Sequence, residues 1–233
     1  MRETFRINSF LWFAAVVSIF GLATVTVLLM KPTGYDGGNF AFTPTIIGLL
    51  YTATCVFGVF AVFFPQKCQR TLIFGKYVQS PGDQTFAPGK LQFTGHHPDC
   101  SRFSANRIKI RNKVLCSACS GLLIGAMIAI AGAVSYFFFR FDFLWSDLRI
   151  LVVSDAGLFL GLFQFRFAGW IKLSVNALFV VCSLVTLVEA DLLSKSLFID
   201  LYVLGLIVFM LSARILLSEW NNKRTCNKCL RCV

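Results

Sequence analysis

The sequence predicts an all-α membrane protein, a bundle of six transmembrane helices that carries one small β-rich insert. Only 14% of the 233 residues are charged and 57% are hydrophobic, whereas a soluble domain has about 25% charged residues. The apolar residues come in blocks of about 20, which is long enough to cross a bilayer as a helix. Such a helix satisfies its own backbone hydrogen bonds in lipid. A single long polar stretch, residues 65–113, separates the second block from the third.

The six apolar blocks define the expected spans. The fourth is short and contains Asp155, and the first has an apolar run too long for a signal peptide. The spans are Phe10–Met30, Thr45–Phe64, Val114–Phe139, Ile150–Phe165, Leu173–Val188 and Leu197–Leu217. Glu189 and Asp191 are expected as solvated residues just past the outer end of the fifth span.

The basic residues predict the orientation of the bundle. With six spans, one side of the membrane receives only Lys31, Arg140, Arg149 and Lys195, and the other side receives the rest of the 22 Lys and Arg residues. Because basic residues accumulate on the cytoplasmic side, both termini and the long polar loop are predicted to be cytoplasmic in the cell membrane. The net charge of +11 then serves orientation and contact with anionic lipid, and no specific nucleic acid is expected.

The polar loop has the composition of a small β-rich cytoplasmic module. Thr71–Gln79, Lys90–Gly95 and Arg107–Arg111 have strand-like composition, and the turn sequences SPGD and APGK lie between the first two. The predicted organisation is therefore helices 1 and 2 in residues 1–64, the insert in 65–119, helices 3 to 6 in 120–217 and a basic, Cys-rich tail in 218–233.

A module of this size rarely buries enough apolar surface to be stable without a disulfide or a metal, and a disulfide is disfavoured in the cytoplasm. His97-x-x-Cys100 and Cys116-x-x-Cys119 form two short pairs at the spacing of a zinc ribbon. They predict one structural zinc ion, with His96 as the alternative to His97. If only three of these residues bind the metal, an open position remains and the site could be catalytic. The remaining alternative is that the four residues are unrelated and bind no metal.

These residues also resemble a family of prokaryotic multi-pass membrane proteins of unknown function, which carry a His/Cys-Pro segment and then a C-x-x-C-[ST]-G motif that opens a membrane helix. Asp155 with Gly157, and Asn176, resemble two later motifs of that family. The resemblance implies a membrane location and a shared Cys/His feature, and it implies no activity. The positions that carry it are His97, Pro98, Cys100, Phe103, Cys116, Cys119, Ser120, Gly121 and Gly125.

Three further features follow from local pattern. Gly121-x-x-x-Gly125 predicts close packing of two membrane helices. Asp155 and Asn176 form a candidate intramembrane polar site, because polar residues inside spans are costly and are often functional. The tail supplies a second candidate metal site, for which iron–sulfur ligation, lipidation and free thiols are the alternatives; its residues are Cys68, Cys226, Cys229 and Cys232.

The sequence leaves three functions open. The first is a non-enzymatic membrane scaffold or accessory subunit that docks a protein partner on the metal module. The second is a small-solute or ion transporter that uses Asp155, and the third is a membrane-bound metal or redox sensor or enzyme. No phosphate-binding loop, nucleophile elbow or H-E-x-x-H motif is present, so the chain is expected not to be an enzyme of those classes.

Overall fold

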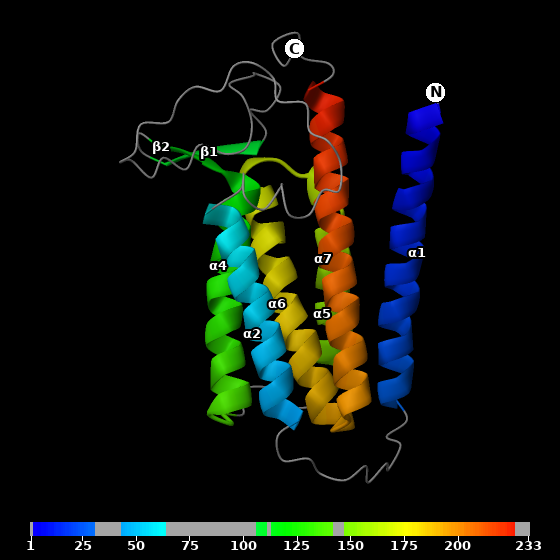
Figure 1. Ribbon diagram of the computed structural model, residues 1–233, viewed down its shortest axis with the longest axis vertical. Coiled ribbons are helices and arrows are strands. Elements are labelled where there is room, and N and C mark those ends of the chain that lie inside the picture. Colours follow the sequence, from blue (N-terminus) through cyan, green and yellow to red (C-terminus); the bar gives the residue numbers. More distant parts are fainter. Residues whose placement is uncertain (1, 31–42, 64–105, 111–112, 142–146, 227–233) are drawn as a thin grey trace.

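Long helices run side by side through most of the chain (Figure 1). The structure is a computed structural model that describes residues 2–30, 43–63, 106–110, 113–141 and 147–226. The helices are α1 (Arg2–Met30), α2 (Thr43–Phe63), α4 (Ser117–Ala133), α5 (Leu148–Leu162), α6 (Gly169–Ser194) and α7 (Leu197–Cys226). Helix α4 continues as a π-helical turn, Val134–Phe138, and a short 3-10 helix, Gln164–Arg166, follows α5.

The predicted helical segments are confirmed, and five of them have the length and composition of membrane spans. Among the described residues these spans are Trp12–Met30, Pro44–Phe63, Ser117–Phe138, Gly169–Ser194 and Leu197–Ser218. Helix α5 has 15 residues, or about 22 Å at 1.5 Å per residue, and falls short of the roughly 30 Å hydrocarbon layer. The chain is thus an integral membrane protein of the helical class.

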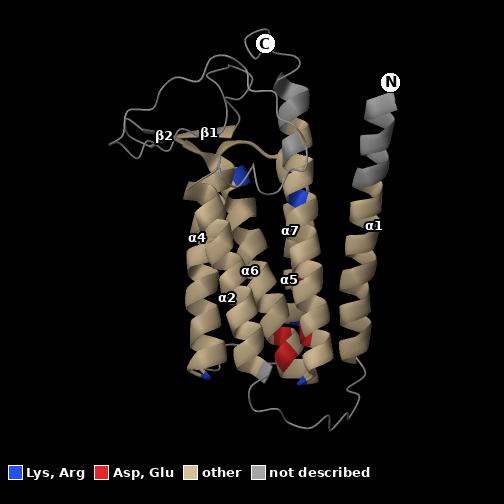
Figure 2. Ribbon diagram, viewed as in Figure 1, with Lys and Arg blue, Asp and Glu red and all other residues tan. Residues whose placement is uncertain are grey.

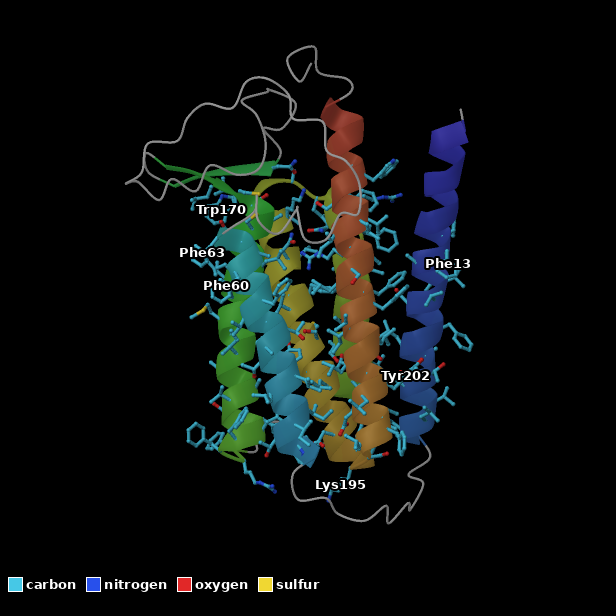
Figure 3. All side chains as sticks on the ribbon, in the orientation of Figure 1. Phe13, Phe60, Phe63, Trp170, Lys195 and Tyr202 are labelled. Atoms are coloured by element: carbon cyan, nitrogen blue, oxygen red, sulfur yellow. The ribbon has the colours of Figure 1, made fainter. Side chains whose placement is uncertain are left out.

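The outer surface of the bundle is apolar and faces lipid. Phe13, Phe60 and Trp170 lie at this surface (Figure 3), each about three-fifths exposed at 59%. Aromatic residues are common where membrane helices meet lipid and the interface. In the interior, large side chains pack against small residues of neighbouring helices. Phe137 of the π-helical turn, for example, packs against Gly48 of α2.

Helix α6 is the centre of the bundle and the most buried of the five candidate spans. It packs against α4 on one side and α5 on another, and it also contacts α1 and α7. Gly121 and Gly125 of α4 lie directly against the backbone of α6, at Leu173 and Ala177. The predicted small-x-x-x-small packing is therefore confirmed, because only glycine lets the two backbones approach so closely.

Two short strands precede α4. β1 (Arg107–Ile110) pairs antiparallel with β2 (Lys113–Cys116), with Ile108 opposite Leu115. The strand predicted at Arg107–Arg111 is confirmed over Arg107–Ile110, whereas Arg111 and the other two predicted strands lie outside the described residues. Because Lys113–Cys116 belongs to β2, the third span begins at Ser117 and not at Val114.

Several predicted boundaries differ from the observed ones. Helix α6 begins at Gly169 and ends at Ser194, beyond the predicted limits of Leu173 and Val188 at both ends. Helix α7 continues past Leu217 to Cys226, so the first part of the predicted tail is helical. The hydropathy pattern marks the apolar part of a helix, and both helices extend beyond it into polar residues.

The charges of the described residues are distributed unevenly between the two ends of the bundle. Asp and Glu gather near the end opposite the β-hairpin (Figure 2). Helix α1 begins, and α7 ends, at the hairpin end (Figure 1). The orientation predicted from the basic residues would place the hairpin end in the cytoplasm.

Candidate functional site at the hairpin end

Cys116 and Cys119 form a thiol pair where β2 meets α4. Cys116 is the N-cap residue of α4, in extended conformation, and Cys119 lies in the first turn. A hydrogen bond from the Cys119 thiol lowers the pKa of Cys116 to about 6, helped by backbone N–H groups of the first turn and by Lys172, although burial acts in the opposite direction. A helix N-terminus favours thiolate in this way. The local geometry therefore prepares Cys116 as a metal ligand or a nucleophile.

The other predicted zinc ligands lie outside the described residues. These are His97 with its alternative His96, and Cys100. The same holds for Cys68, Cys229 and Cys232 of the second candidate site, while Cys226 is described only as the last residue of α7. Within the described part of the chain, no group of three or more His, Cys, Asp or Glu side chains comes together.

Asn106 ties the hairpin to the bundle beside the thiol pair. Its Oδ1 accepts a hydrogen bond from Lys172 Nζ at 2.6 Å, and its carbonyl accepts one from Ser117 Oγ at 3.1 Å. Lys172 belongs to the first turn of α6 and is 5% exposed. Its ammonium group lies within electrostatic range of both thiols and of Arg214.

Arg214 of α7 lies just inside this layer and is 1% exposed. Its Nη2 donates to Gln164 Oε1 at 3.0 Å and to Asn176 Oδ1. Asn176 in turn donates from Nδ2 to the carbonyl of Lys172. The guanidinium carbon lies 4.5 Å from the centre of the Phe179 ring, a cation–π distance. We refer to Lys172, Asn176, Gln164 and Arg214 as the basic cluster.

The guanidinium of Arg214 is only partly satisfied by these contacts. Among the described residues, neither Nε nor Nη1 has a hydrogen-bond partner. An unpaired buried ion is disfavoured by several kcal/mol. Polar side chains here are therefore arranged around two cations, and no described carboxylate contacts either of them.

Asp155 has its hydrogen-bond partners elsewhere in the bundle. Asp155 accepts from Thr26 Oγ1 and from Thr186 Oγ1, each at 3.2 Å. Thr186 and Asn176 are ten residues apart on α6, or about 15 Å along its axis. The structure therefore places Asp155 and Asn176, which the sequence treats as one candidate site, in separate hydrogen-bonded clusters.

Acidic residues at the opposite end of the bundle are more buried than expected. Glu189 is fully buried, and its Oε2 accepts from the backbone N–H of Asp147 at 3.2 Å. Asp191 accepts from Tyr136 Oη at 2.7 Å. The expectation that Glu189 is solvated is wrong, because α6 continues to Ser194 and keeps that residue inside the bundle.

Sequence reasoning missed Lys172 and Arg214 as site residues. Their signal lies in helix periodicity. Four buried polar residues of α6 follow one another at steps of four, seven and three, which places them on a single helix face. We call these four residues, Lys172, Asn176, Ser183 and Thr186, the polar stripe. Because the rest of the span is apolar, polar residues at this spacing indicate that Lys172 and Asn176 face the same neighbouring helix.

Comparison with known proteins adds no assignment to this site. No protein-family model matches the chain, and neither a curated protein nor a solved structure matches it significantly.

Proposed function

We propose that this integral membrane protein carries a structural zinc site on its cytoplasmic face and acts as a scaffold or accessory subunit of a membrane complex. One observation carries the proposal, namely that Cys116 and Cys119 are already assembled at the junction between the hairpin and α4, with the Cys116 pKa lowered to about 6. Zinc binds thiolates, so a lowered thiol pKa favours binding.

The insert would supply the rest of the zinc coordination sphere. His97, or His96 in its place, and Cys100 form the second short pair, separated from the first by a spacer that contains β1. Four ligands close a tetrahedral site and leave no open position for catalysis. A closed site suits a structural role, in which the metal fixes residues 65–105 to the end of the bundle.

The scaffold role is supported by how firmly the thiol pair is joined to the membrane domain. Cys119 is one residue from Ser120 and two from Gly121, whose Cα faces the carbonyl of Leu173 on α6. The hairpin is joined to the same helix through Asn106 and Lys172. A partner docked on the metal module would therefore be held at a fixed position relative to the bundle, next to anionic lipid at the basic face.

The test is the metal content of the purified full chain. We expect about one zinc per chain in the wild type and a loss of that zinc in Cys116→Ser. Cys182→Ser is the matched control, because Cys182 is buried in α6 away from the hairpin and should leave the zinc in place. His96→Ala and His97→Ala identify the histidine ligand. A wild type without bound metal refutes the proposal.

A metal or redox sensor is the second candidate, and the low pKa of Cys116 favours it. In that case the zinc would exchange with chelator within minutes, or the two thiols would form a disulfide under mild oxidation. A zinc ion that resists both treatments assigns the site to the structural role. The transporter alternative rests on Asp155, and Asp155→Asn should then abolish flux and leave folding intact.

A further inference from the structure

The basic cluster is the strongest unexplained feature of the bundle. Arg214 is 1% exposed and Lys172 is 5% exposed, and the two lie within electrostatic range of each other. Buried charges of one sign are normally compensated by opposite charge. Among the described residues, the side chains with a recorded contact to Arg214 are two neutral amides, Gln164 and Asn176, and the ring of Phe179.

The unused donors of Arg214 define what the cluster lacks. A guanidinium has five N–H donors, and Nη2 directs its two to the amide oxygens of Gln164 and Asn176. The one N–H of Nε and the two of Nη1 have no partner among the described residues. An oxyanion satisfies such donors and offsets the charge of both cations at once.

The depth of the cluster favours a phosphate group. Arg214 lies four residues before the end of the span Leu197–Ser218, and Lys172 lies three residues after the start of Gly169–Ser194. At 1.5 Å per residue, the two Cα atoms lie about 4.5 Å and about 6 Å inside the ends of their spans. This is close to the level of lipid head groups.

We propose that the basic cluster is a binding site for a phosphate-bearing anion, held by the free N–H groups of Arg214 and by Lys172. Gln164 and Asn176 orient the guanidinium by accepting the hydrogen bonds of Nη2, and the ring of Phe179 packs against it. The cluster adjoins the proposed zinc site, because Lys172 also lies within electrostatic range of Cys116 and Cys119, but the anion site rests on the contacts of Arg214 and not on a bound metal. The phosphate comes either from an anionic lipid head group or from a soluble phosphate compound.

The test uses the full chain in neutral detergent, with thermal unfolding followed by tryptophan fluorescence. One arm compares sodium phosphate with sodium chloride at equal ionic strength. The other arm compares mixed micelles of phosphatidylglycerol with micelles of phosphatidylcholine. At a hundredfold excess over Kd, a bound ligand should raise the unfolding midpoint by on the order of 5–10 °C. A response in the first arm identifies a soluble phosphate, and a response only in the second identifies a head group.

Three variants assign the response to the cluster. Arg214→Met should abolish it, and Arg149→Met, which removes an exposed arginine at the opposite end, should retain it. Gln164→Glu places a carboxylate next to Nη2, so it should raise the midpoint without ligand and reduce the response. An unresponsive wild type overturns the proposal, as does a full response in Arg214→Met. If Arg214→Met does not fold, an unchanged response in Gln164→Glu overturns it.

Discussion

The packing of α4 on α6 makes a sharp prediction at Gly125. A Cβ atom at this position would lie 2.7 Å from the carbonyl oxygen of Ala177 and 3.0 Å from its Cα. Both distances are short of ordinary van der Waals contact, which begins at 3.4 Å. The obstacle is the backbone of α6, which no rotamer change removes. Gly125→Ala must therefore push α4 and α6 apart.

Helix α6 cannot easily retreat from the added methyl group. On another side it is held by α5, where Gly157 contacts Cys182 and Gly161 contacts Phe179. Introducing one methylene into a well-packed core destabilises by about 1–3 kcal/mol. The substitution also gains about 1 kcal/mol of helix propensity. The cost of the clash is therefore measured by comparison with a Gly→Ala substitution that gains the same helix propensity and causes no clash.

Gly205 of α7 provides that control, because a Cβ there would meet nothing within 4 Å. We expect Gly125→Ala to be less stable than Gly205→Ala by about 1–3 kcal/mol. For a chain of this size the unfolding midpoint should then differ by roughly 2–12 °C. The assay is thermal unfolding of both variants in the same detergent. Equal midpoints would show that the two helices are not in backbone contact at Gly125.

Two further predictions concern polar groups at different depths. Tyr51 Oη shares a hydrogen bond with Ser183 Oγ at 2.7 Å inside the bundle, so Tyr51→Phe should lower the free energy of unfolding by about 0.5–1.5 kcal/mol. The control Tyr202→Phe, on the lipid-facing side, should change it by less than about 0.5 kcal/mol. Equal losses in the two variants would contradict the buried hydrogen bond. In metal-free protein, the rate of Cys116 alkylation should rise with pH to half its maximum near pH 6, because the folded-state pKa is lowered to about 6 and only the thiolate reacts. Because the pKa of Cys116 is lower in the folded state, its ionisation adds to the free energy of unfolding. This contribution is fully present above the unfolded-state pKa of about 8.5, and it is lost as the pH falls through about 6. A midpoint near pH 8.5, measured as the difference from Cys116→Ser, would contradict the assigned environment.

Local patterns predicted the elements of this fold well. The apolar blocks located the helices because membrane helices must satisfy their backbone within the segment itself. The thiol pair was predictable for the same local reason, since a three-residue separation across a helix start brings Cys116 and Cys119 together. The glycines Gly121 and Gly125 were likewise readable, because the spacing of small residues marks a helix face that another helix can approach.

Contacts between distant segments were not predictable in this way. Asn176 and Arg214 are 38 residues apart, and their contact depends on how α6 and α7 are rotated about their axes. Hydropathy gives the depth of a residue in the membrane and says nothing of this rotation. For this reason Lys172 and Arg214 appeared in the sequence as ordinary charges at the predicted cytoplasmic end, and Glu189 as a solvated residue.

The polar stripe explains why α6 has one defined rotation in an otherwise apolar bundle. Apolar helices in lipid have little reason to prefer one face, because lipid is as apolar as a neighbouring helix. Each stripe residue has a partner on a different element: Lys172 contacts Asn106, Asn176 contacts Arg214, Ser183 contacts Tyr51 and Thr186 contacts Asp155. A step of one residue rotates a helix by about 100° and would turn all four away from their partners together.

The position of the basic cluster therefore depends on hydrogen bonds along the whole length of α6. Each interhelical hydrogen bond in a membrane protein contributes only about 0.6 kcal/mol on average, too little for one of them to fix a helix. Several that share one face act together, because no rotation satisfies some of them and not the others. Ser183 and Thr186, deep in the bundle, thus help to hold Asn176 beside Arg214 near the hairpin end.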